Sequence, residues 1–447
     1  MKIAFVSLGC DKNLADTELM LEILRGKGYE FTDDAQEADA AVVNTCCFIG
    51  DAKEESINTV LELAELRREG RLKALVAAGC LAQRYGKEIR EEIPEVDGLV
   101  GTAAIEDILE AVETALSGEK RDFFRDLDSP PAVRRERVLT TGGHFAYLKI
   151  AEGCNKRCTY CVIPAVRGNY RSIPMEELTA QAEKLAEEGV RELILVAQET
   201  TLYGVDLYGE KSLPLLLRRL ARISGLYWIR ILYCYPEEIT EELISVMAEE
   251  PKICHYLDIP IQHSSDTVLK RMGRRTDQAQ LRRMIGLLRE RIPDICLRTT
   301  LISGFPGETQ EDFEDLYRFV NEMEFDRLGV FPYSQEEDTA AALMPDQIPD
   351  EVKEFRRDEL MELQQAIAFE KAQEMAGQVL TVMIEGKVAD DDVYVGRTYR
   401  DAPGVDGYLF VNTSADLMTG DFVRAIVTDS NEYDLIGEIY YEEDELT

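Results

Sequence analysis

The sequence lacks any apolar run long enough to cross a membrane. A spanning helix needs about 18 to 20 consecutive apolar residues, and no stretch of the 447-residue chain reaches that length. Met1 and Lys2 begin only a short apolar stretch, which Asp11, Lys12 and Asn13 interrupt, so no signal peptide is predicted. We therefore expect a protein of the cytoplasm that has no membrane partner.

Basic residues are in short supply. The chain has 50 lysines and arginines against 86 aspartates and glutamates, which gives a formal net charge of −36 at pH 7. Nucleic-acid binding depends largely on cationic side chains that neutralise phosphates, so this balance argues against nucleic acid as the main partner. An acidic surface attracts basic partners instead, although acidity can also serve solubility alone.

Histidine is scarce as well, with three residues against ten cysteines. Three of the cysteines, Cys154, Cys158 and Cys161, form a C-x3-C-x2-C group in "CNKRCTYC". In a reducing compartment they are not expected to form disulfides, but they can bind three irons of a 4Fe–4S cube and leave the fourth iron open. Structural zinc is the alternative, but it needs a fourth ligand, and the nearest histidine, His144, lies ten residues upstream.

Hydrophobic periodicity divides the chain into three folded parts and a linker. Residues 1–117 alternate four short apolar runs with four helical patterns, which predicts an open parallel α/β sheet with helices on both faces. Residues 118–143 carry mixed charge with Pro-Pro and Gly-Gly pairs, which is typical of a linker. Residues 144–372 contain six strand–helix units and end in a long charged helix over 350–375, which predicts a partial or complete parallel (β/α)6 barrel. Residues 373–447 contain short strands separated by Gly, Asp and Asn, which predict a small antiparallel β-barrel.

Cysteines also follow the first three predicted strands. Cys10, Cys46 and Cys80 each come just after an apolar run, and the carboxyl ends of parallel strands share one edge of a sheet, where such folds bind ligands. We therefore predict that these thiols converge on a second metal cluster; three unrelated core cysteines are the alternative. Cys47 points differently from its neighbour Cys46, so at most one of the two fits. The remaining cysteines lie within or beside barrel strands and are predicted as core residues: Cys234, Cys254 and Cys296.

Polar residues and glycines follow several barrel strands, at the face where parallel barrels carry out chemistry. The predicted ligand contacts are Gln198 and Glu199 after the second strand, Gln262 and Ser264 after the fourth, Arg298 within the fifth and Gly304 after it. Two of them have a structural alternative. Arg298 can form an ion pair, and Gly304 begins a turn that leads to a helix cap at Thr309. His263 is as readily structural as functional.

A C-x3-C-x2-C group after the first strand of a parallel barrel resembles the radical S-adenosylmethionine superfamily. Together with three dispersed N-terminal cysteines and a C-terminal barrel, it makes the whole chain resemble the methylthiotransferase family, whose C-terminal barrel is a TRAM domain. The resemblance implies two 4Fe–4S clusters: one at Cys154, Cys158 and Cys161, and an auxiliary one at Cys10, Cys46 and Cys80. It also implies S-adenosylmethionine at the strand-end residues named above and an external electron donor.

The resemblance also implies how the reaction proceeds. An electron from the first cluster cleaves S-adenosylmethionine to a 5′-deoxyadenosyl radical, which removes a hydrogen atom from an unactivated carbon. The auxiliary cluster carries the sulfur, and a second S-adenosylmethionine supplies the methyl group. The cofactors perform the difficult chemistry, so no catalytic residue is predicted beyond the cluster ligands.

Short strings around the cysteines resemble the branch of the family that methylthiolates the β-carbon of an aspartate in ribosomal protein uS12. "SLGCDKNLADTE" is similar to the usual SLGCPKNLVDSE of that branch, and "AYLKIAEGCNKRCTYCVIP" and "AQETTLYG" also resemble it. The tRNA branch, which modifies an adenosine, more usually shows TFGCQMN and GQN, and it remains the alternative. The chain departs from the uS12 pattern at Asp11, where proline is usual, and at Glu199, where aspartate is usual.

The charge of the C-terminal part bears on the same choice. Residues 373–447 carry 17 acidic and four basic side chains, a net charge of −13. A TRAM barrel that binds RNA is expected to be basic, whereas an acidic one suits a basic ribosomal protein. The sequence therefore favours uS12 as the substrate.

Overall fold

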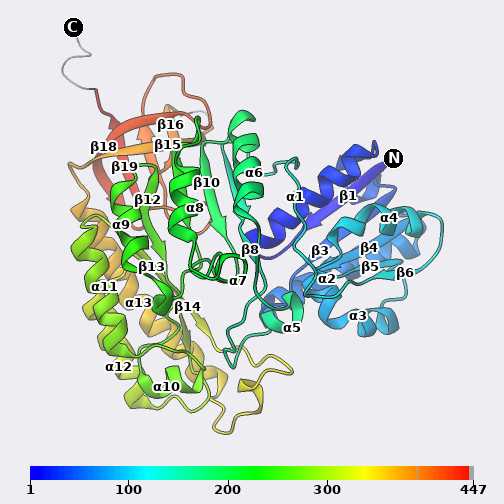
Figure 1. Ribbon diagram of the computed structural model, residues 1–447, viewed down its shortest axis with the longest axis horizontal. Helices are drawn as coiled ribbons and strands as arrows, with labels where there is room; N and C mark the ends of the chain where they lie inside the picture. The colour runs from blue at the N-terminus through cyan, green and yellow to red at the C-terminus, as the bar shows by residue number, and fades with distance from the viewer. Residues whose placement is uncertain (390, 442–447) are drawn as a thin grey trace.

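A computed structural model describes residues 1–389 and 391–441. Figure 1 shows an N-terminal sheet in blue, a central open barrel mostly in green, and a C-terminal barrel in orange and red above it. Residue 390 and residues 442–447, which belong to the predicted C-terminal domain, lie outside the described residues. In the described part of the chain, no helix combines the length and the apolar character that crossing a bilayer requires.

The N-terminal part is an open parallel sheet with the strand order β2-β1-β3-β4-β5-β6. Helices α1 and α4 cover one face and α2 and α3 the other, as predicted. Successive residues of a strand point to opposite faces, so Val42 packs beneath α1 and α4 while Val43 packs beneath α2 and α3. The elements are β1 (Lys2–Ser7), α1 (Asp11–Gly26), β2 (Glu30–Thr32), β3 (Ala40–Thr45), α2 (Gly50–Arg68), β4 (Ala74–Gly79), α3 (Cys80–Glu92), β5 (Gly98–Val100), α4 (Ile108–Leu116) and β6 (Arg121–Phe123).

Strand β6 lies within residues 118–143, where the sequence pattern predicts a linker. It pairs in parallel with β5 and extends the N-terminal sheet. Further along this segment, the Thr140 N–H donates to Glu18 of α1 at 2.9 Å, and Arg137 lies 3.4 Å from the same carboxylate. Part of the predicted linker is therefore packed on the N-terminal sheet. A strand of three residues is too short to give a periodic signal.

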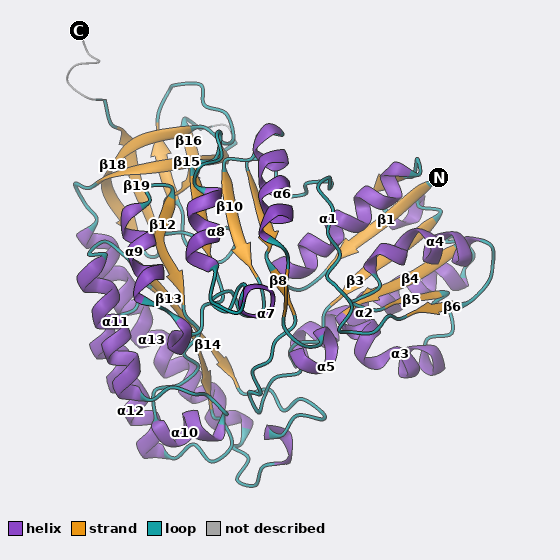
Figure 2. Cartoon of the chain, viewed as in Figure 1, coloured by secondary structure: helices purple, strands orange, loops and turns teal. Residues whose placement is uncertain are grey.

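The central part is a six-stranded parallel sheet whose order, β7-β10-β11-β12-β13-β14, follows the chain. The sheet is open, with β7 and β14 at its edges, so the barrel is partial; Figure 2 shows helices along its outside. Its strands are β7 (Phe145–Lys149), β10 (Glu192–Val196), β11 (Trp228–Ile231), β12 (Ile253–Asp258), β13 (Cys296–Ser303) and β14 (Arg327–Pro332), with the short pair β8 (Ala151–Glu152) and β9 (Arg171–Ser172) beside them. Its helices are α5 (Ile163–Arg167), α6 (Met175–Glu187), α7 (Val205–Tyr208), α8 (Leu213–Leu220), α9 (Glu241–Glu249), α10 (Asp266–Arg271), α11 (Gln278–Arg291), α12 (Gln310–Met323) and α13 (Asp350–Glu374).

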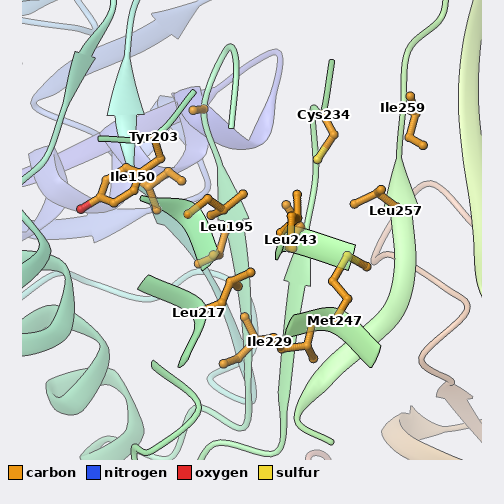
Figure 3. Packing of buried hydrophobic residues seen from close by; sticks show 14 of the residues in the cluster. Ile150, Leu195, Tyr203, Leu217, Ile229, Cys234, Leu243, Met247, Leu257 and Ile259 are labelled. Carbon is orange, nitrogen blue, oxygen red and sulfur yellow. The ribbon is translucent and has the colours of Figure 1, made fainter. Parts of the chain in front are cut away.

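The core of the central part lies between its strands and the outer helices. Figure 3 shows this packing, in which Leu195 of β10 and Leu217 of α8 take part. Cys234 is fully buried in the same cluster, and Cys254 and Cys296 lie in a second apolar cluster. The prediction that these three cysteines are core residues is thereby confirmed.

The C-terminal part is a closed five-stranded barrel with the order β15-β16-β17-β19-β18. Four of its pairings are antiparallel, as predicted, whereas β17 and β19 pair in parallel. The long helix α13 leads into it, at the position that the sequence predicts. The strands are β15 (Val379–Lys387), β16 (Val393–Arg397), β17 (Leu409–Asn412), β18 (Phe422–Asn431) and β19 (Asp434–Ile439).

The C-terminal barrel is attached at the amino ends of the central strands. Glu192, the first residue of β10, accepts hydrogen bonds from Arg230 of β11 at 2.7 Å and from Arg397 of β16 at 2.8 Å. All three side chains are essentially inaccessible to solvent. In the loop after β16, Asp401 pairs with Arg327 of β14 at 2.6 Å. Buried charge pairs therefore join the two parts at this end of the barrel, and an apolar cluster in which Phe422 packs against Trp228 adds to the attachment.

We predict that Glu192→Gln destabilises the protein because it leaves the buried guanidinium of Arg230 without a counter-charge and leaves Arg397 with Glu385 as its only carboxylate partner. Removing one partner of a buried ion pair typically costs about 3 to 5 kcal/mol, which thermal unfolding followed by circular dichroism would detect as a lower melting temperature. Glu176→Gln is the matched control, since the ion pair of Glu176 with Arg219 is exposed and exposed pairs contribute little. Equal melting temperatures for the two variants would contradict the prediction.

Candidate active site

The three N-terminal cysteines lie at one edge of the N-terminal sheet. Cys10 precedes α1, Cys46 follows β3 and Cys80 opens α3, and the strands that lead to them are neighbours in the sheet. Their loops are in close contact, because a Cβ atom placed on Gly9 would lie 2.8 Å from the Cys46 Sγ. The structure thus brings the three cysteines to one edge, as the strand order requires. Their binding of a cluster stays a prediction.

Glycines turn the chain sharply just before two of these cysteines. Gly9 and Gly79 have φ angles of +87° and +88°, in the left-handed region that favours glycine. A Cβ atom on Gly79 would lie only 2.3 Å from the Asn44 Oδ1. The recurring Gly-Cys pair therefore lets a loop leave its strand abruptly and pack against the neighbouring loop.

Asparagine and threonine side chains hold these loops together. Asn13 Nδ2 donates to the Leu8 carbonyl at 3.0 Å and to the Thr45 carbonyl at 2.9 Å, which ties the first loop to the second. Thr45 Oγ1 donates to the Ala78 carbonyl at 2.6 Å, which ties the second strand end to the third. The Asn13 amide and the Thr45 hydroxyl are thus paired, as burial requires, and they brace the edge on which the cysteines lie.

Cys46 and Cys47 occupy different environments, as their adjacency in an extended segment predicts. Cys47 is fully buried in the apolar cluster beneath α2 and α3. Cys46 is not among the residues of that cluster, and its N–H donates to Ser56 Oγ at 2.9 Å. Of the two, Cys46 is therefore the better candidate for a cluster ligand.

The second cysteine group follows β8 of the central barrel. Cys154 and Cys158 are buried and Cys161 is partly buried, and the Cys158 Sγ lies 3.7 Å from the Tyr235 hydroxyl. Burial raises the pKa of Cys154 to about 11 and that of Cys161 to about 12, and burial likewise raises the pKa of Cys80 to about 12. Iron must therefore displace protons when it binds these thiols. Buried thiols grouped in this way are a donor set that fits iron–sulfur clusters.

A site for a single metal ion has to be considered separately from a site for an iron–sulfur cluster. Among the described residues, no three histidine, cysteine, aspartate or glutamate side chains are placed to bind one ion. The thiolates of a 4Fe–4S cube each bind a different iron, so this finding concerns mononuclear sites alone.

A buried network of charges connects the N-terminal sheet to the central barrel. Arg167 of α5 donates from Nη1 to Asp16 of α1 at 2.7 Å and to Glu152 of β8 at 3.2 Å. Lys149 of β7 lies 2.8 Å from the same Glu152 and also pairs with Asp16. Each of the four residues is less than 10% exposed. Two cations and two carboxylates neutralise one another, which allows all four charges to stay buried.

This network contacts the first cysteine group and adjoins the second along the chain. Arg167 Nη2 lies 3.4 Å from the Cys80 Sγ, and the same nitrogen donates to Asn13 Oδ1. Glu152 is separated from Cys154 by a single glycine and accepts a hydrogen bond from Gln198 Nε2 at 2.7 Å. The two loops that carry the cysteines are thus fixed relative to each other by one set of charges.

Motif spacing does not reveal the network. The available signal is a charged residue inside an otherwise apolar strand, Lys149 in "FAYLKIAEG", because a buried lysine is seldom without a partner. The identity of that partner is not visible in the sequence, since Asp16 lies 133 residues away along the chain.

Buried polar atoms without hydrogen bonds occur in the segments that follow β10 and β12. Among the described residues they include Gln198 Oε1, Glu199 Oε2 and Ser264 Oγ, and His263 Nε2, which lies 3.6 Å from the Glu308 carboxylate. Buried polar groups are normally paired, so these atoms fit a site for a polar ligand such as S-adenosylmethionine. The contact of Gln198, Glu199 and Ser264 with that cofactor stays a prediction.

Two of the predicted cofactor contacts are occupied within the protein. Arg298 donates to Asp258 at 3.1 Å and lies 3.6 Å from Asp406, which is the ion-pair alternative. Gly304 packs against α13, where the Lys353 Cγ would lie 2.3 Å from a Cβ atom on the glycine. A cofactor contact by Arg298 would require it to exchange its carboxylate partners.

For Gln262 and for the predicted helix cap at Thr309, the structure shows a well-defined backbone conformation. Gln262 has a φ of +70°, and its N–H donates to the Thr300 carbonyl at 2.9 Å. Gln262 is therefore held at the mouth of the barrel in a conformation that is costly for a residue with a side chain. Thr309 caps α12 in a reciprocal arrangement with Asp312, so the helix cap predicted for the turn after Gly304 is confirmed.

Comparisons with known families divide the chain in the same way as its fold. Residues 148–320 match the Radical SAM superfamily, residues 2–101 match a family described as Uncharacterized protein family UPF0004, and residues 376–439 match the TRAM domain. Similar folds occur among solved structures. The methyltransferase TsrM from Kitasatospora setae aligns with a TM-score of 0.53 at 15% identity over 74% of this chain and 72% of that chain. The cobalamin-dependent radical enzyme OxsB aligns with a TM-score of 0.51 at 13% identity over 81% and 56%.

Curated relatives are similar over almost the whole chain. A protein of Lachnoclostridium phytofermentans is 61% identical over 98% of this chain and 99% of its own length. A protein of Pelotomaculum thermopropionicum is 52% identical over 98% and 99%, and one of Clostridioides difficile is 48% identical over 99% and 99%. All three are named ribosomal protein uS12 methylthiotransferase RimO.

The environment of Glu199 predicts a pH-dependent stability. Burial raises the pKa of Glu199 to about 8, above its unfolded value of about 4.3. The stability that the protonated carboxyl contributes is complete below pH 4 and is lost as the pH rises towards 8. In protein prepared without iron, wild type should therefore lose stability relative to Glu199→Gln between pH 5 and 8, by at most about 1.4 kcal/mol per pH unit.

Urea denaturation across this pH range measures the difference between the two proteins. Glu187→Gln, at an exposed position of α6, serves as the control and should run parallel to wild type. A constant difference between wild type and Glu199→Gln from pH 5 to pH 8 would show that the carboxyl is not protonated in the folded protein.

Proposed function

The chain belongs to the family of ribosomal protein uS12 methylthiotransferases, radical S-adenosylmethionine enzymes, and we propose that it methylthiolates the β-carbon of an aspartate in uS12. The observation that carries the proposal is the meeting of two cysteine groups at one buried network. Cys80 of the first group contacts Arg167, and Glu152, next to the second group, pairs with the same arginine. The identity of 61% to a relative of that name, over nearly the full length, supports the assignment of the substrate.

The cysteines have distinct roles in this proposal. Cys154, Cys158 and Cys161 hold the cluster that serves S-adenosylmethionine, and Cys10, Cys46 and Cys80 hold the auxiliary cluster. When bound, the two 4Fe–4S clusters and S-adenosylmethionine supply the electron, the radical, the sulfur and the methyl group that the reaction needs.

The protein's own contribution is to position these groups and to keep water away. Asp16, Lys149, Glu152 and Arg167 fix the distance between the two cysteine loops, and their burial keeps solvent out of the space between them. Gln198, Glu199 and Ser264 present polar atoms to S-adenosylmethionine. Fixed orientation of reacting groups lowers the barrier of such chemistry, by up to about 7 to 11 kcal/mol in well-oriented systems.

The partner and the location follow from charge and composition. The acidic C-terminal barrel, with its net charge of −13 over 373–447, suits a basic ribosomal protein rather than RNA. Ribosomal proteins are encountered in the cytoplasm, where we place this enzyme. An external reductant supplies the electrons, since the proposed roles leave no residue of the chain as their source.

A substrate assay tests the function directly. The reconstituted enzyme, supplied with S-adenosylmethionine and a reductant, should add the mass of one methylthio group to uS12, and peptide mapping should place it on an aspartate. Total tRNA, digested to nucleosides after the same incubation, should be unchanged. Modification of tRNA alone would replace the proposal with the tRNA activity.

Cysteine substitutions separate the roles of the two clusters. Replacing Cys154, Cys158 and Cys161 by alanine should halve the bound iron and abolish reductive cleavage of S-adenosylmethionine. Replacing Cys10, Cys46 and Cys80 should also halve the iron but leave that cleavage measurable, while methylthiolation is lost. The triple variant of the core cysteines Cys234, Cys254 and Cys296, changed to serine, is the matched control and should keep its iron. Full iron content in the second variant would mean that those thiols are not ligands.

A further inference from the structure

Lys12 is the exception among the buried lysines of this chain. Four lysines in the described residues are at most 9% exposed, and three of them contact carboxylates. Lys149 pairs with Asp16 and Glu152, Lys156 with Glu237 and Glu238, and Lys353 with Asp350. In the same part of the chain, Lys12 has neither an ion-pair partner nor a hydrogen bond from its ammonium group, although it is only 6% exposed. The side chain is mostly enclosed, but its ammonium nitrogen is not sealed from solvent. An anion can therefore approach it and supply the counter-charge that the protein does not.

The ammonium group lies where the two halves of the active site meet. Lys12 is two residues beyond Cys10, in the first turn of α1. Its Nζ lies 3.1 Å from the ring centroid of Tyr233, just after β11 at the carboxyl end of the barrel. A cation over an aromatic face is stabilised by about 0.5 to 2 kcal/mol, which offsets part of the cost of burial but leaves the charge without an anion.

Tyr233 is held firmly as the platform for this lysine. Its φ is +60°, a conformation that side-chain-bearing residues adopt at a cost and mainly at functional sites. Its N–H donates to Asp258 at 3.0 Å, its carbonyl accepts from the Thr200 N–H at 3.1 Å, and its hydroxyl donates to Asp11 at 2.8 Å. Asp11 Oδ1 is thereby engaged with the tyrosine, while Asp11 Oδ2 is buried without a hydrogen bond, and neither oxygen forms an ion pair with Lys12.

We propose that Lys12 binds the side-chain carboxylate of the substrate aspartate. The inference rests on the proposed function and deepens it, because it assigns a residue to the recognition of the modified side chain. The carboxylate of an aspartate is bonded directly to the β-carbon, so a cation that binds the carboxylate also fixes the carbon that reacts. The missing anion of the site and the charge of the substrate side chain are then complementary.

The test compares two substrates and three enzymes. The modified aspartate is first located by mass spectrometry of the wild-type product, and a second uS12 is made in which it is replaced by asparagine. Wild-type holoenzyme should favour the aspartate substrate over the asparagine one by at least tenfold in kcat/KM. Lys12→Met, which keeps the length of the side chain but not its charge, should lose most of this discrimination. Lys12→Arg, which keeps the charge, should retain it.

Two measurements separate substrate binding from a structural role. Lys12→Met should keep its full iron content and its cleavage of S-adenosylmethionine in the absence of uS12, since the lysine is not a cluster ligand in the proposal. Lys27→Met, at the exposed end of the same helix, is the matched control and should discriminate like wild type. Loss of iron from Lys12→Met, in place of lost discrimination, would assign the lysine to the cluster site and overturn the inference.

The outcomes distinguish this inference from the proposed function. A wild-type enzyme that modifies no uS12 at all would refute the function itself. A wild-type enzyme that modifies the asparagine substrate as fast as the aspartate one would overturn the role of Lys12 without any variant. Unchanged discrimination in Lys12→Met would do the same.

Discussion

The four-membered charge network of Asp16, Lys149, Glu152 and Arg167 is the constraint on which the active site depends. It is the point at which the N-terminal sheet, the cysteine loop of the barrel and the strand end that carries Gln198 come together. A charge cluster of this kind contributes little net stability compared with an apolar core, but it fixes geometry strictly, because displacement of any member leaves a buried charge unpaired. Chemistry that passes between two cofactors needs that kind of fixed separation more than it needs extra stability.

The N-terminal sheet and the central barrel present their cysteines next to this network in a similar way. In both parts, cysteines follow the ends of strands, and a glycine with a positive φ turns the chain just before three of them, at Gly9, Gly79 and Gly153. The polar residues beside the cysteines, Asn13 and Thr45, serve as braces between loops. Two groups of cysteines thus lie at strand ends of two separate sheets.

The sequence predicts the architecture well because the fold is built from repeated strand–helix units with clear periodicity. All six central strands and the long helix α13 lie where the apolar pattern places them, and Cys10, Cys46 and Cys80 share an edge because parallel topology leaves no other arrangement. The apolar pattern does not show which side chains form contacts when their residues are far apart in the sequence. The pairing of Arg298 with Asp406 and the contact of Arg167 with Cys80 depend on how the domains are docked, whereas Asp258 lies opposite Arg298 on the neighbouring strands β12 and β13. Strand β6 is too short to stand out from the charged segment around it.

The position of the C-terminal barrel sets how far a substrate has to reach. It is attached at the amino ends of the central strands, through Glu192, Arg230 and Arg397, whereas both cysteine groups lie at the carboxyl ends (Figure 1). A strand of six residues spans roughly 20 Å. A partner that touched the C-terminal barrel near Glu192 would therefore have to reach along the length of a strand before one of its side chains came near the cysteines.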